Sequence, residues 1–375
     1  MFDTLRDHLD VIWGFLVALA VVLVLTPAVG RVARVLGIVD EPLERRRIHL
    51  QAVPRLGGLA LFFGVFVPAL AFLDLSGPYR GILLGAALAT TVGMADDFRG
   101  LPWWVKLGGQ AGAAAIAIDF GVRIDRFTFP FIGIHELPFW ASVAVTLVWI
   151  VAIMNMVNFL DGLAAGICGI SGATFAVIAL SLGNPEAAVL SAIIAGACLG
   201  FLRHNFYPAR IFMGDSGALL MGFLLATVSI QGLLKTAATV ALFFPLFALA
   251  VPIFDTSFVL LRRLKHREPL YLPDQAHLHH RFLRRGFTQR RAVLYLYAWC
   301  AILGGAALAT RFVPFRESGQ WHLWPTLVVA LVGAIAVGAT FYIVMILEIL
   351  KLTRVRAWAG RRREAKDEQS KAISA

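Results

Sequence analysis

Long, nearly uninterrupted apolar stretches are the feature that most limits how this chain can fold. The runs 61–73, 143–157 and 326–350 contain almost no charged residue. A membrane-spanning helix needs about 20 mainly apolar residues, and 59% of the 375 residues are hydrophobic while only 15% are charged. This composition excludes a disordered chain, a nucleic-acid-binding domain and an ordinary cytosolic enzyme. We therefore predict an all-α polytopic integral membrane protein.

The hydropathy pattern predicts about eleven transmembrane helices in a single domain, residues 1–352. The predicted spans are 11–33, 56–75, 81–95, 103–120, 139–155, 163–182, 186–202, 217–232, 238–261, 292–310 and 323–352. Residues 353–375 are rich in charge, and we expect a basic, disordered cytoplasmic tail there. Segment 123–134 partly alternates polar and apolar residues around Pro130 and Gly133, which predicts a short outer β-hairpin.

Basic residues are distributed unevenly between the two sets of loops. With the N-terminus outside, 27 of the 34 Lys and Arg residues fall on the inner side of the membrane and 7 on the outer side. Cytoplasmic loops carry such an excess, so we predict an outer N-terminus and a cytoplasmic C-terminus. The same bias accounts for the net charge of +11 without a nucleic-acid partner. The acidic leader, residues 1–10, is unlike a signal peptide, so the first span is expected to be retained.

Polar residues suited to chemistry are concentrated in five loops that all follow odd-numbered spans. These are segments 40–58, 96–97, 155–161, 204–215 and 277–280, which read DEPLERRRIHLQAVPRLGG, DD, NMVNFLD, HNFYPARIFMGD and HLHH. Their parity predicts that all five lie on one side of the membrane, and the charge bias indicates the cytoplasmic side. A transport pathway would place its ionisable groups near the bilayer midplane. An active site at the membrane surface is therefore favoured.

The residue types in these loops are typical of phosphoryl transfer. Carboxylates and amides without a cysteine ligand set suit a hard cation such as Mg²⁺, whose shell is completed by water and substrate phosphates. The Arg and His residues beside them can contact phosphate. Two alternatives stay open at this point: the DD pair as a solvated helix end, and the HLHH histidines as zinc ligands. The three cysteines lie in apolar stretches and are expected to serve in packing: Cys168, Cys198 and Cys300.

Five motifs in order resemble the polyprenyl-phosphate N-acetylhexosamine-1-phosphate transferase family. They read DEPLERRRIHLQAVPRLGG, MADDFRG, NMVNFLDG, FYPARIFMGDSG and HLHHRF, and they lie between residues 40 and 282. The interrupted HLHH is similar to the undecaprenyl-phosphate N-acetylglucosamine-1-phosphate transferase branch. The related phospho-N-acetylmuramoyl-pentapeptide transferases typically have three consecutive histidines instead.

The resemblance implies a reaction between two phosphorylated substrates. The phosphate of a membrane polyprenyl (undecaprenyl) phosphate attacks the β-phosphorus of a UDP-N-acetylhexosamine, with N-acetylglucosamine as the expected sugar. The products are a polyprenyl-diphospho-sugar and UMP, as a first step of lipid-linked cell-surface glycan synthesis. The resemblance also implies Mg²⁺, with Mn²⁺ as a substitute, surrounding membrane lipids, a homodimer as a frequent state, and a cytoplasmic active site in the bacterial inner membrane.

The resemblance assigns roles to individual residues. The metal would be bound by Asp215 and Asp161. Catalytic roles would fall to the acidic pair and the histidine motif: Asp96, Asp97, His277, His279 and His280. Substrate contacts would come from five further positions: His49, Lys106, Asn158, Asn205 and Phe212. Among these, Asn205 is expected near the uridine, Phe212 stacked on the uracil and Lys106 near the diphosphate.

Two positions depart from the family pattern. Family members commonly carry a second acid three residues after Asp161, where this chain has Ala164, and they carry Arg-Lys where it has Arg46 and Arg47. Arg and Lys are not interchangeable at a specific contact. Because this acid is missing, a catalytically inactive member of the family stays open as an alternative. A transporter of anionic lipids is a second alternative.

Several residues have a simpler structural interpretation. Phe212 could be an ordinary interfacial aromatic residue, and Lys106 could extend to lipid head groups. Asp255 lies within the ninth predicted span and has no assigned role, although an acid inside a membrane is usually functional. Gly57 and Gly58 are expected to permit close helix approach rather than to cradle phosphate.

Overall fold

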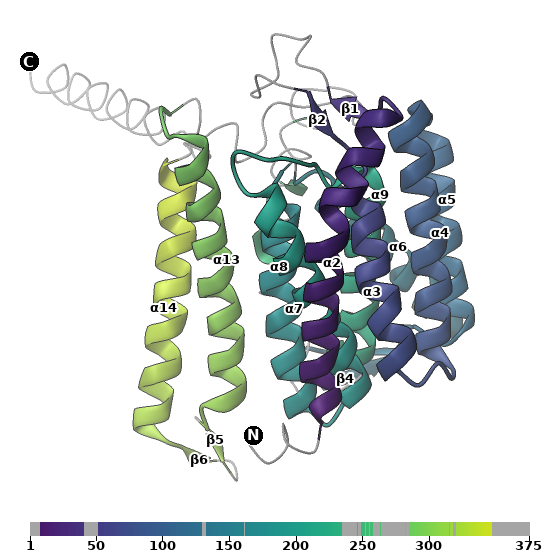
Figure 1. Ribbon diagram of the computed structural model, residues 1–375. Helices are drawn as coiled ribbons and strands as arrows, with labels where there is room; N and C mark the ends of the chain where they lie inside the picture. Colours follow the sequence, from purple (N-terminus) through teal and green to yellow (C-terminus); the bar gives the residue numbers. More distant parts are fainter. Residues whose placement is uncertain are drawn as a thin grey trace, which may run out of the picture.

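The computed structural model describes ten α-helices that stand side by side along one common direction (Figure 1). It describes residues 8–40, 52–129, 133–160, 162–234 and most of 285–346, with scattered positions between 246 and 282. The helices are α2 (Leu9–Val35), α3 (Gly57–Phe72), α4 (Pro78–Arg99), α5 (Trp103–Asp119), α6 (Phe139–Asn158), α7 (Ala164–Ser181), α8 (Pro185–Asn205), α9 (Gly214–Val228), α13 (Gln289–Phe312) and α14 (Leu323–Ile346). A π-helical turn, η1 (Ser229–Leu234), continues α9.

The helical, polytopic architecture predicted from hydropathy is confirmed. Eight helices of the described residues are long and apolar enough to cross a membrane. Helices α3 and α5 are shorter, with 16 and 17 residues. Most of the ninth predicted span, 238–261, and all of the tail, 353–375, lie outside the described residues. The total of eleven spans and the domain boundary at residue 352 therefore stay predictions.

Within the described residues, three short antiparallel strand pairs lie at the two ends of the bundle. They pair β1 (Val39–Asp40) with β2 (Val53–Pro54), β3 (Arg126–Phe129) with β4 (Gly133–Glu136), and β5 (Arg316–Glu317) with β6 (Gln320–Trp321). The second pair confirms the predicted hairpin but shifts it along the chain, because Arg126 pairs with Glu136. Gly133 pairs with Phe129 in the sheet, so its expected place in the turn was wrong.

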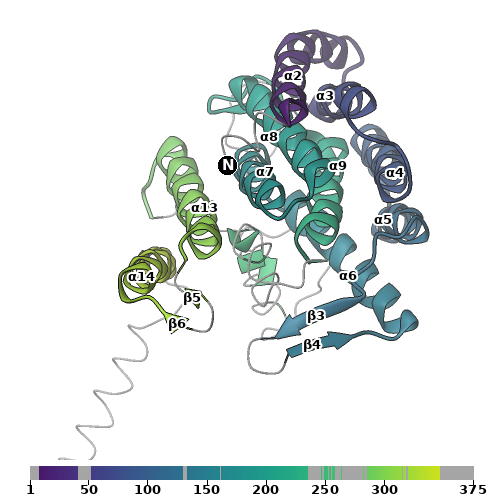
Figure 2. The same cartoon turned by 90° about the horizontal axis from the view of Figure 1, so that it is seen from below.

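Helices α7, α8 and α9 form the interior of the bundle, while α13 and α14 stand at one side (Figure 2). In the most apolar stretch of the segment formed by α9 and η1, 83% of residues are buried, against 11% in α14. The outward-facing residues of α14 include Leu331 and Val337. Apolar residues of a membrane protein can face lipid without cost, so burial here reflects helix packing and not hydrophobicity.

Small residues allow the inner helices to approach closely, as predicted for Gly57 and Gly58. A Cβ added at Gly58 would lie 2.2 Å from the backbone nitrogen of Gly217, across the α3–α9 contact. The three cysteines are buried in the hydrophobic core and form no disulfide, which confirms their predicted role in packing. Contacts of this kind replace the hydrophobic driving force that is absent between helices in lipid.

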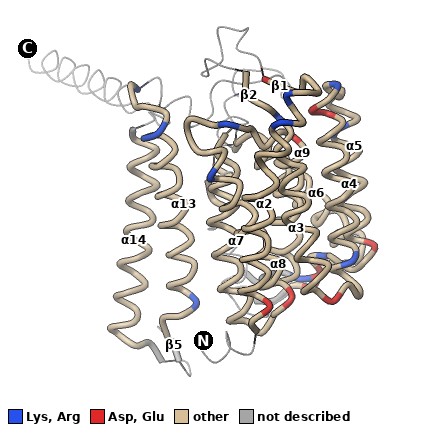
Figure 3. Tube along the Cα trace, viewed as in Figure 1, with Lys and Arg blue, Asp and Glu red and all other residues tan. Residues whose placement is uncertain are grey.

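Charged residues are confined to the ends of the described helices (Figure 3). Every Lys, Arg, Asp and Glu in those helices lies within the first or last two turns. Exposed aromatic residues lie at both ends, with Trp103 and Trp104 at the start of α5 and Trp140 and Trp324 at the opposite end. Such aromatic belts mark the two membrane–water interfaces.

Candidate active site

Four helix ends meet at the end of the bundle that also carries β1 and β2 (Figure 1). Asp96 and Asp97 lie in the last turn of α4, Asn158 ends α6, and Asp215 lies in the first turn of α9. Lys106 lies in the first turn of α5. Four of the five polar segments expected on one side of the membrane thus share one end of the bundle. The fifth, 277–280, lies outside the described residues.

Three helices extend beyond the predicted limits of their spans, by three or four residues. Spans three and five were expected to end at residues 95 and 155, and span eight to start at residue 217. The structure extends α4 to Arg99 and α6 to Asn158, and it starts α9 at Gly214. The acidic and amide side chains therefore project from rigid helix ends and not from loops, which places them more accurately than loops could.

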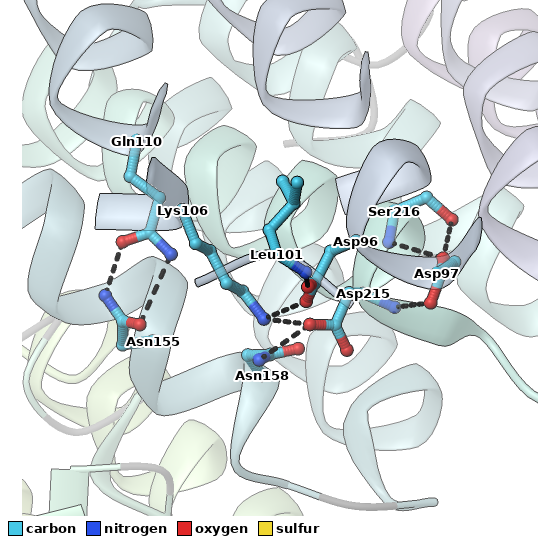
Figure 4. A network of polar contacts seen from close by, with 9 residues as sticks. All are labelled: Asp96, Asp97, Leu101, Lys106, Gln110, Asn155, Asn158, Asp215 and Ser216. Atoms are coloured by element: carbon cyan, nitrogen blue, oxygen red, sulfur yellow. Dashed lines mark hydrogen bonds and ion pairs between the residues drawn. The ribbon is translucent and has the colours of Figure 1, made fainter. Parts of the chain in front are cut away.

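Lys106 is the centre of an ion-paired cluster (Figure 4). Its Nζ lies 2.8 Å from Oδ2 of Asp96 and also pairs with Oδ2 of Asp215. Asn158 donates from Nδ2 to the same Asp215 oxygen at 3.5 Å, and Asp96 Oδ1 accepts from the backbone N–H of Leu101 at 2.6 Å. All three charged side chains are less than one fifth exposed. Limited hydration strengthens the attraction between such charges.

Asp97 makes a different set of contacts from its neighbour. Its Oδ1 accepts the backbone N–H of Asp215 at 2.8 Å. Its Oδ2 accepts the backbone N–H of Ser216 at 3.0 Å and the hydroxyl of Ser216 at 2.7 Å. The adjacent acids are therefore divided: Asp96 faces Lys106, and Asp97 faces the start of α9 (Figure 4).

A pair of amides, the buried Gln110 and the half-buried Asn155, lies one turn deeper in the membrane (Figure 4). Asn155 donates to Gln110 Oε1 at 2.6 Å, and Gln110 donates to Asn155 Oδ1 at 3.3 Å. Sequence reasoning assigned no role to this pair. The signal was present, because Gln110 follows Lys106 by four residues and Asn155 precedes Asn158 by three, which puts each couple on one helix face.

The segment before α9 is joined to β2 and to the start of α3 by backbone hydrogen bonds. Phe212 donates to Pro54 at 2.7 Å and accepts from Gly57 at 3.0 Å, while Gly58 donates to Met213 at 2.7 Å. The buried Asn205 donates from Nδ2 to the carbonyl of Ile211 at 3.0 Å. These contacts hold the chain on both sides of the turn that leads into Asp215.

Comparison with known proteins shows extensive similarity over the same region. The profile of "Glycosyl transferase family 4" matches residues 79–233, from the start of α4 to η1. A "Probable undecaprenyl-phosphate N-acetylglucosaminyl 1-phosphate transferase" of Bacillus subtilis (strain 168) is 39% identical over 76% of this chain and 81% of its own length. The chain belongs to the polyprenyl-phosphate N-acetylhexosamine-1-phosphate transferase family. The family resemblance drawn from the five motifs is thus confirmed.

Two other members of this transferase family match over a similar extent. A "Decaprenyl-phosphate N-acetylglucosaminephosphotransferase" of Mycobacterium leprae (strain TN) is 35% identical over 78% of this chain and 82% of its own length. An "Undecaprenyl-phosphate alpha-N-acetylglucosaminyl 1-phosphate transferase" of Escherichia coli (strain K12) is 27% identical over 76% of this chain and 80% of its own length.

Several residues singled out by the resemblance to the transferase family lie outside the described residues. These are His49, Asp161, His277, His279 and His280. Their assigned roles stay predictions, as do the substrate contacts expected of Asn205 and Phe212. Ala164, which stands where family members commonly have an acid, is 7% exposed and belongs to the hydrophobic core at the start of α7.

The described side chains fit the metal that the transferase family implies. Two carboxylates, Asp96 and Asp215, and the amide of Asn158 converge on one point, where Lys106 already places a positive charge. Within the described residues, no group of three His, Cys, Asp or Glu could hold a metal ion. Mg²⁺ typically uses one or two carboxylates and takes its remaining ligands from water and substrate phosphates, so this donor set suits it.

Proposed function

We propose that this chain transfers N-acetylglucosamine-1-phosphate from a UDP-sugar to a membrane polyprenyl phosphate and releases UMP. The convergence of Asp96, Lys106, Asn158 and Asp215 at one end of a membrane bundle carries the proposal. The names of the Bacillus and Mycobacterium relatives describe N-acetylglucosamine phosphate transfer to undecaprenyl and decaprenyl phosphate. A site at the interface suits one substrate that is held in the bilayer and another that is dissolved in water.

The proposed step needs charge screening and alignment more than it needs a strong base. A phosphate oxygen of the lipid forms a bond to the β-phosphorus of the UDP-sugar. The bond between that phosphorus and the bridging oxygen breaks, and UMP leaves with the oxygen. Because the second pKa of a phosphate monoester is about 6, the nucleophile is mainly a dianion at neutral pH. It must approach a negatively charged diphosphate, so cations are required.

Lys106 is proposed to supply one of these positive charges. Its Nζ lies 2.8 Å from Asp96 in a cluster that is largely shielded from water. The ion pair holds the long side chain extended before either substrate binds, so less side-chain entropy is lost during the reaction. When the diphosphate enters, phosphate oxygens can replace carboxylate oxygens as acceptors for the ammonium group.

Mg²⁺, with Mn²⁺ as a substitute, is proposed as the second source of charge. Asp215 and Asp96 would hold it, with Asn158 beside them and Asp161 as a further ligand. When bound, the metal neutralises the phosphate oxygens and orients the leaving group. Side chains of the protein hold the proposed metal ligand Asp215 in place, since Asn158 and Lys106 both contact its carboxylate.

The site end is proposed to face the cytoplasm of a bacterial inner membrane. Lys and Arg gather at this end of the described residues, including Arg31, Arg34, Arg99 and Arg203 (Figure 3). This is the asymmetry expected of cytoplasmic loops. A homodimer remains a prediction from the family resemblance alone.

The confinement of charge to helix ends supports an enzyme over a transporter of anionic lipids. A transporter binds its cargo near the bilayer midplane, where ionisable residues line the path. Outside their first two and last two turns, the described helices carry no Lys, Arg, Asp or Glu. An inactive relative would share this architecture, so activity must be measured directly.

The test is the exchange of labelled UMP into a panel of UDP-sugars by purified protein in detergent, with polyprenyl phosphate and with or without Mg²⁺. We expect exchange with UDP-N-acetylglucosamine that requires both the lipid and the metal. Asp215→Asn should abolish it. Asp125→Asn is a matched control, because this acid lies beside the β3–β4 hairpin at the opposite end of the bundle. Its side chain accepts a hydrogen bond from Ser142 at 3.0 Å and pairs with Arg123 at 3.4 Å, far from the site. No exchange by the unaltered protein would overturn the proposal.

A further inference from the structure

Adjacent residues on an α-helix project about 100° apart, so the acids of the DD pair cannot point at one spot. Asp96 points toward Lys106, while the side chain of Asp97 reaches α9. Gly93 lies one turn before Asp97 and shares its face of α4. A Cβ added at Gly93 would lie 2.5 Å from the carbonyl oxygen of Asp215, so this face of α4 is fitted closely to the backbone of α9.

The start of α9 lacks a capping side chain of its own. The N-cap residue, Met213, makes no side-chain capping hydrogen bond, and Gly214 has no side chain. The first N–H groups of any helix have no partner within the helix and need one elsewhere. Asp97 provides it from another helix, 118 residues earlier in the chain, by accepting the N–H groups of Asp215 and Ser216.

The charge of Asp97 also suits this position. A helix N-terminus carries a partial positive charge, which favours a carboxylate. Hydrogen bonds to an ionised acceptor are stronger than neutral ones. Three donors already approach this carboxylate, two of them on Oδ2. Its acceptor capacity is therefore largely used inside the fold.

The backbone leading into α9 is shaped around the same contact. Gly214 has φ of +71°, a conformation that residues with a side chain rarely adopt. A Cβ at this position would lie 2.5 Å from Asp97 Oδ2 and 2.4 Å from the carbonyl oxygen of Arg55. The turn therefore requires glycine for its conformation and for the space that the Asp97 carboxylate occupies.

We infer that Asp97 is a positioning residue: it caps α9 from α4 and thereby aims the Asp215 carboxylate at Lys106 and Asn158. This revises the catalytic role expected for both members of the DD pair. Asp96 keeps a direct place in the site, whereas Asp97 acts through Asp215. The consequence for catalysis rests on the proposed function, but the capping contact itself does not.

Amide hydrogen exchange of the purified protein in detergent tests the contact without any assay of activity. In Asp97→Asn and Asp97→Ala, the amides of Asp215 and Ser216 should exchange about ten- to a hundredfold faster, as expected for the loss of hydrogen bonds to a charged acceptor. Asp96→Asn is the matched control, because its contacts are with Leu101 and Lys106. It should leave these two amides unchanged.

Ser216→Ala keeps the experiment decisive if the Asp97 variants do not fold. It removes only the hydroxyl donor at 2.7 Å and leaves both backbone donors, so exchange of the two amides should rise only a fewfold. Unchanged exchange in every folded variant at Asp97 and Ser216 would overturn the inference. Equal acceleration in Asp96→Asn would also overturn it, because the effect would not be specific to the cap.

Measuring UMP exchange and amide exchange on the same variant separates positioning from direct proton transfer. If Asp97 only positions Asp215, Asp97→Asn should lower turnover together with the protection of the Asp215 and Ser216 amides. Loss of turnover in a folded Asp97→Asn variant whose two amides keep their wild-type exchange would instead make Asp97 a group that acts on the substrate and overturn the inference. If the unaltered protein shows no exchange of UMP, the proposed function fails. The amide-exchange measurements still test whether Asp97 caps α9.

Discussion

Gln110 and Asn155 exchange hydrogen bonds across the contact between α5 and α6, at 2.6 and 3.3 Å. Gln110 is 1% exposed, so its amide has little access to water. Asn155 also donates to the carbonyl of Val151 in its own helix, at 2.8 Å. Gln110 follows Lys106 by four residues on α5, and Asn155 precedes Asn158 by three residues on α6. The pair therefore fixes the positions of Lys106 and Asn158 relative to each other.

Replacement of Gln110 and replacement of Asn155 should lower the free energy of unfolding by different amounts. Gln110→Leu leaves Asn155 its bond to Val151 and should cost about 1 kcal/mol, whereas Asn155→Leu removes the described partner of a buried amide and should cost about 2 kcal/mol. Thermal unfolding in detergent measures the difference. The double variant should be less destabilised than the sum of the two.

Gln231→Leu is the matched control for the amide pair, because this glutamine donates to the Gly121 carbonyl near the opposite end of the bundle. It should leave UMP exchange unchanged, whereas Gln110→Leu should lower it about tenfold through displacement of Lys106. Equal activity of the two variants would contradict a positioning role for Gln110.

Replacing Lys106 should have opposite effects on turnover and on metal binding. Lys106→Met removes the ammonium that lies between Asp96 and Asp215. The two carboxylates then lack their shared cation, so a divalent ion should bind about tenfold more tightly. Turnover should fall by about a hundredfold, because one of the charges that screen the phosphates is lost.

Titration with Mn²⁺, followed by electron paramagnetic resonance, measures metal affinity independently of turnover. Lys106→Arg should retain the wild-type affinity, since it keeps the positive charge. Weaker Mn²⁺ binding by Lys106→Met would show that the lysine does not compete with the metal for these carboxylates.

A methyl group at Gly58 should destabilise the contact between α3 and α9. The added Cβ would lie 2.2 Å from the backbone nitrogen of Gly217, and backbone cannot move aside as a flexible side chain can. Gly58→Ala should therefore cost about 3 kcal/mol. Gly333→Ala in α14, where nothing lies within 4 Å, should be neutral or slightly stabilising. Thermal unfolding of both variants in detergent provides the comparison.

Membrane orientation can be tested with a thiol reagent that does not cross membranes. The three native cysteines are buried, so the unaltered protein should react little. Arg210→Cys lies at the site end, and Glu136→Cys lies in β4 at the opposite end; both residues are exposed. We expect labelling of Glu136→Cys in intact cells and of Arg210→Cys only in inverted vesicles. The reverse pattern would place the site outside.

Much of the architecture could be predicted because it depends on local composition. Ten of the spans predicted from apolar runs are helices in the structure. A helix is favoured there because the backbone N–H and C=O groups of a segment in lipid must form their hydrogen bonds within that segment. Parity predicted that the segments bearing Asp96, Asn158 and Asp215 share one end. Alternation predicted the β3–β4 hairpin, although its register was displaced.

The limits of the helices could not be predicted from the same signal. Hydropathy falls wherever polar residues begin, but helical hydrogen bonding continues through them, as it does through Asp97 to Arg99 and through Asn158. Asp215 was likewise expected before its helix and lies in the first turn. Polar residues at the membrane surface lower hydropathy without ending the helix, so a hydropathy pattern stops too early.

Composition, hydropathy and motif order were enough to predict a helical membrane protein of the transferase family with its reactive residues gathered at one end. The division of the DD pair, with Asp96 on Lys106 and Asp97 on the start of α9, became evident only from the folded chain. The same holds for the contact between Gln110 and Asn155. The physical reason is that a helix places its neighbours in all directions, and which partner each one meets depends on how the helices are rotated and shifted against one another.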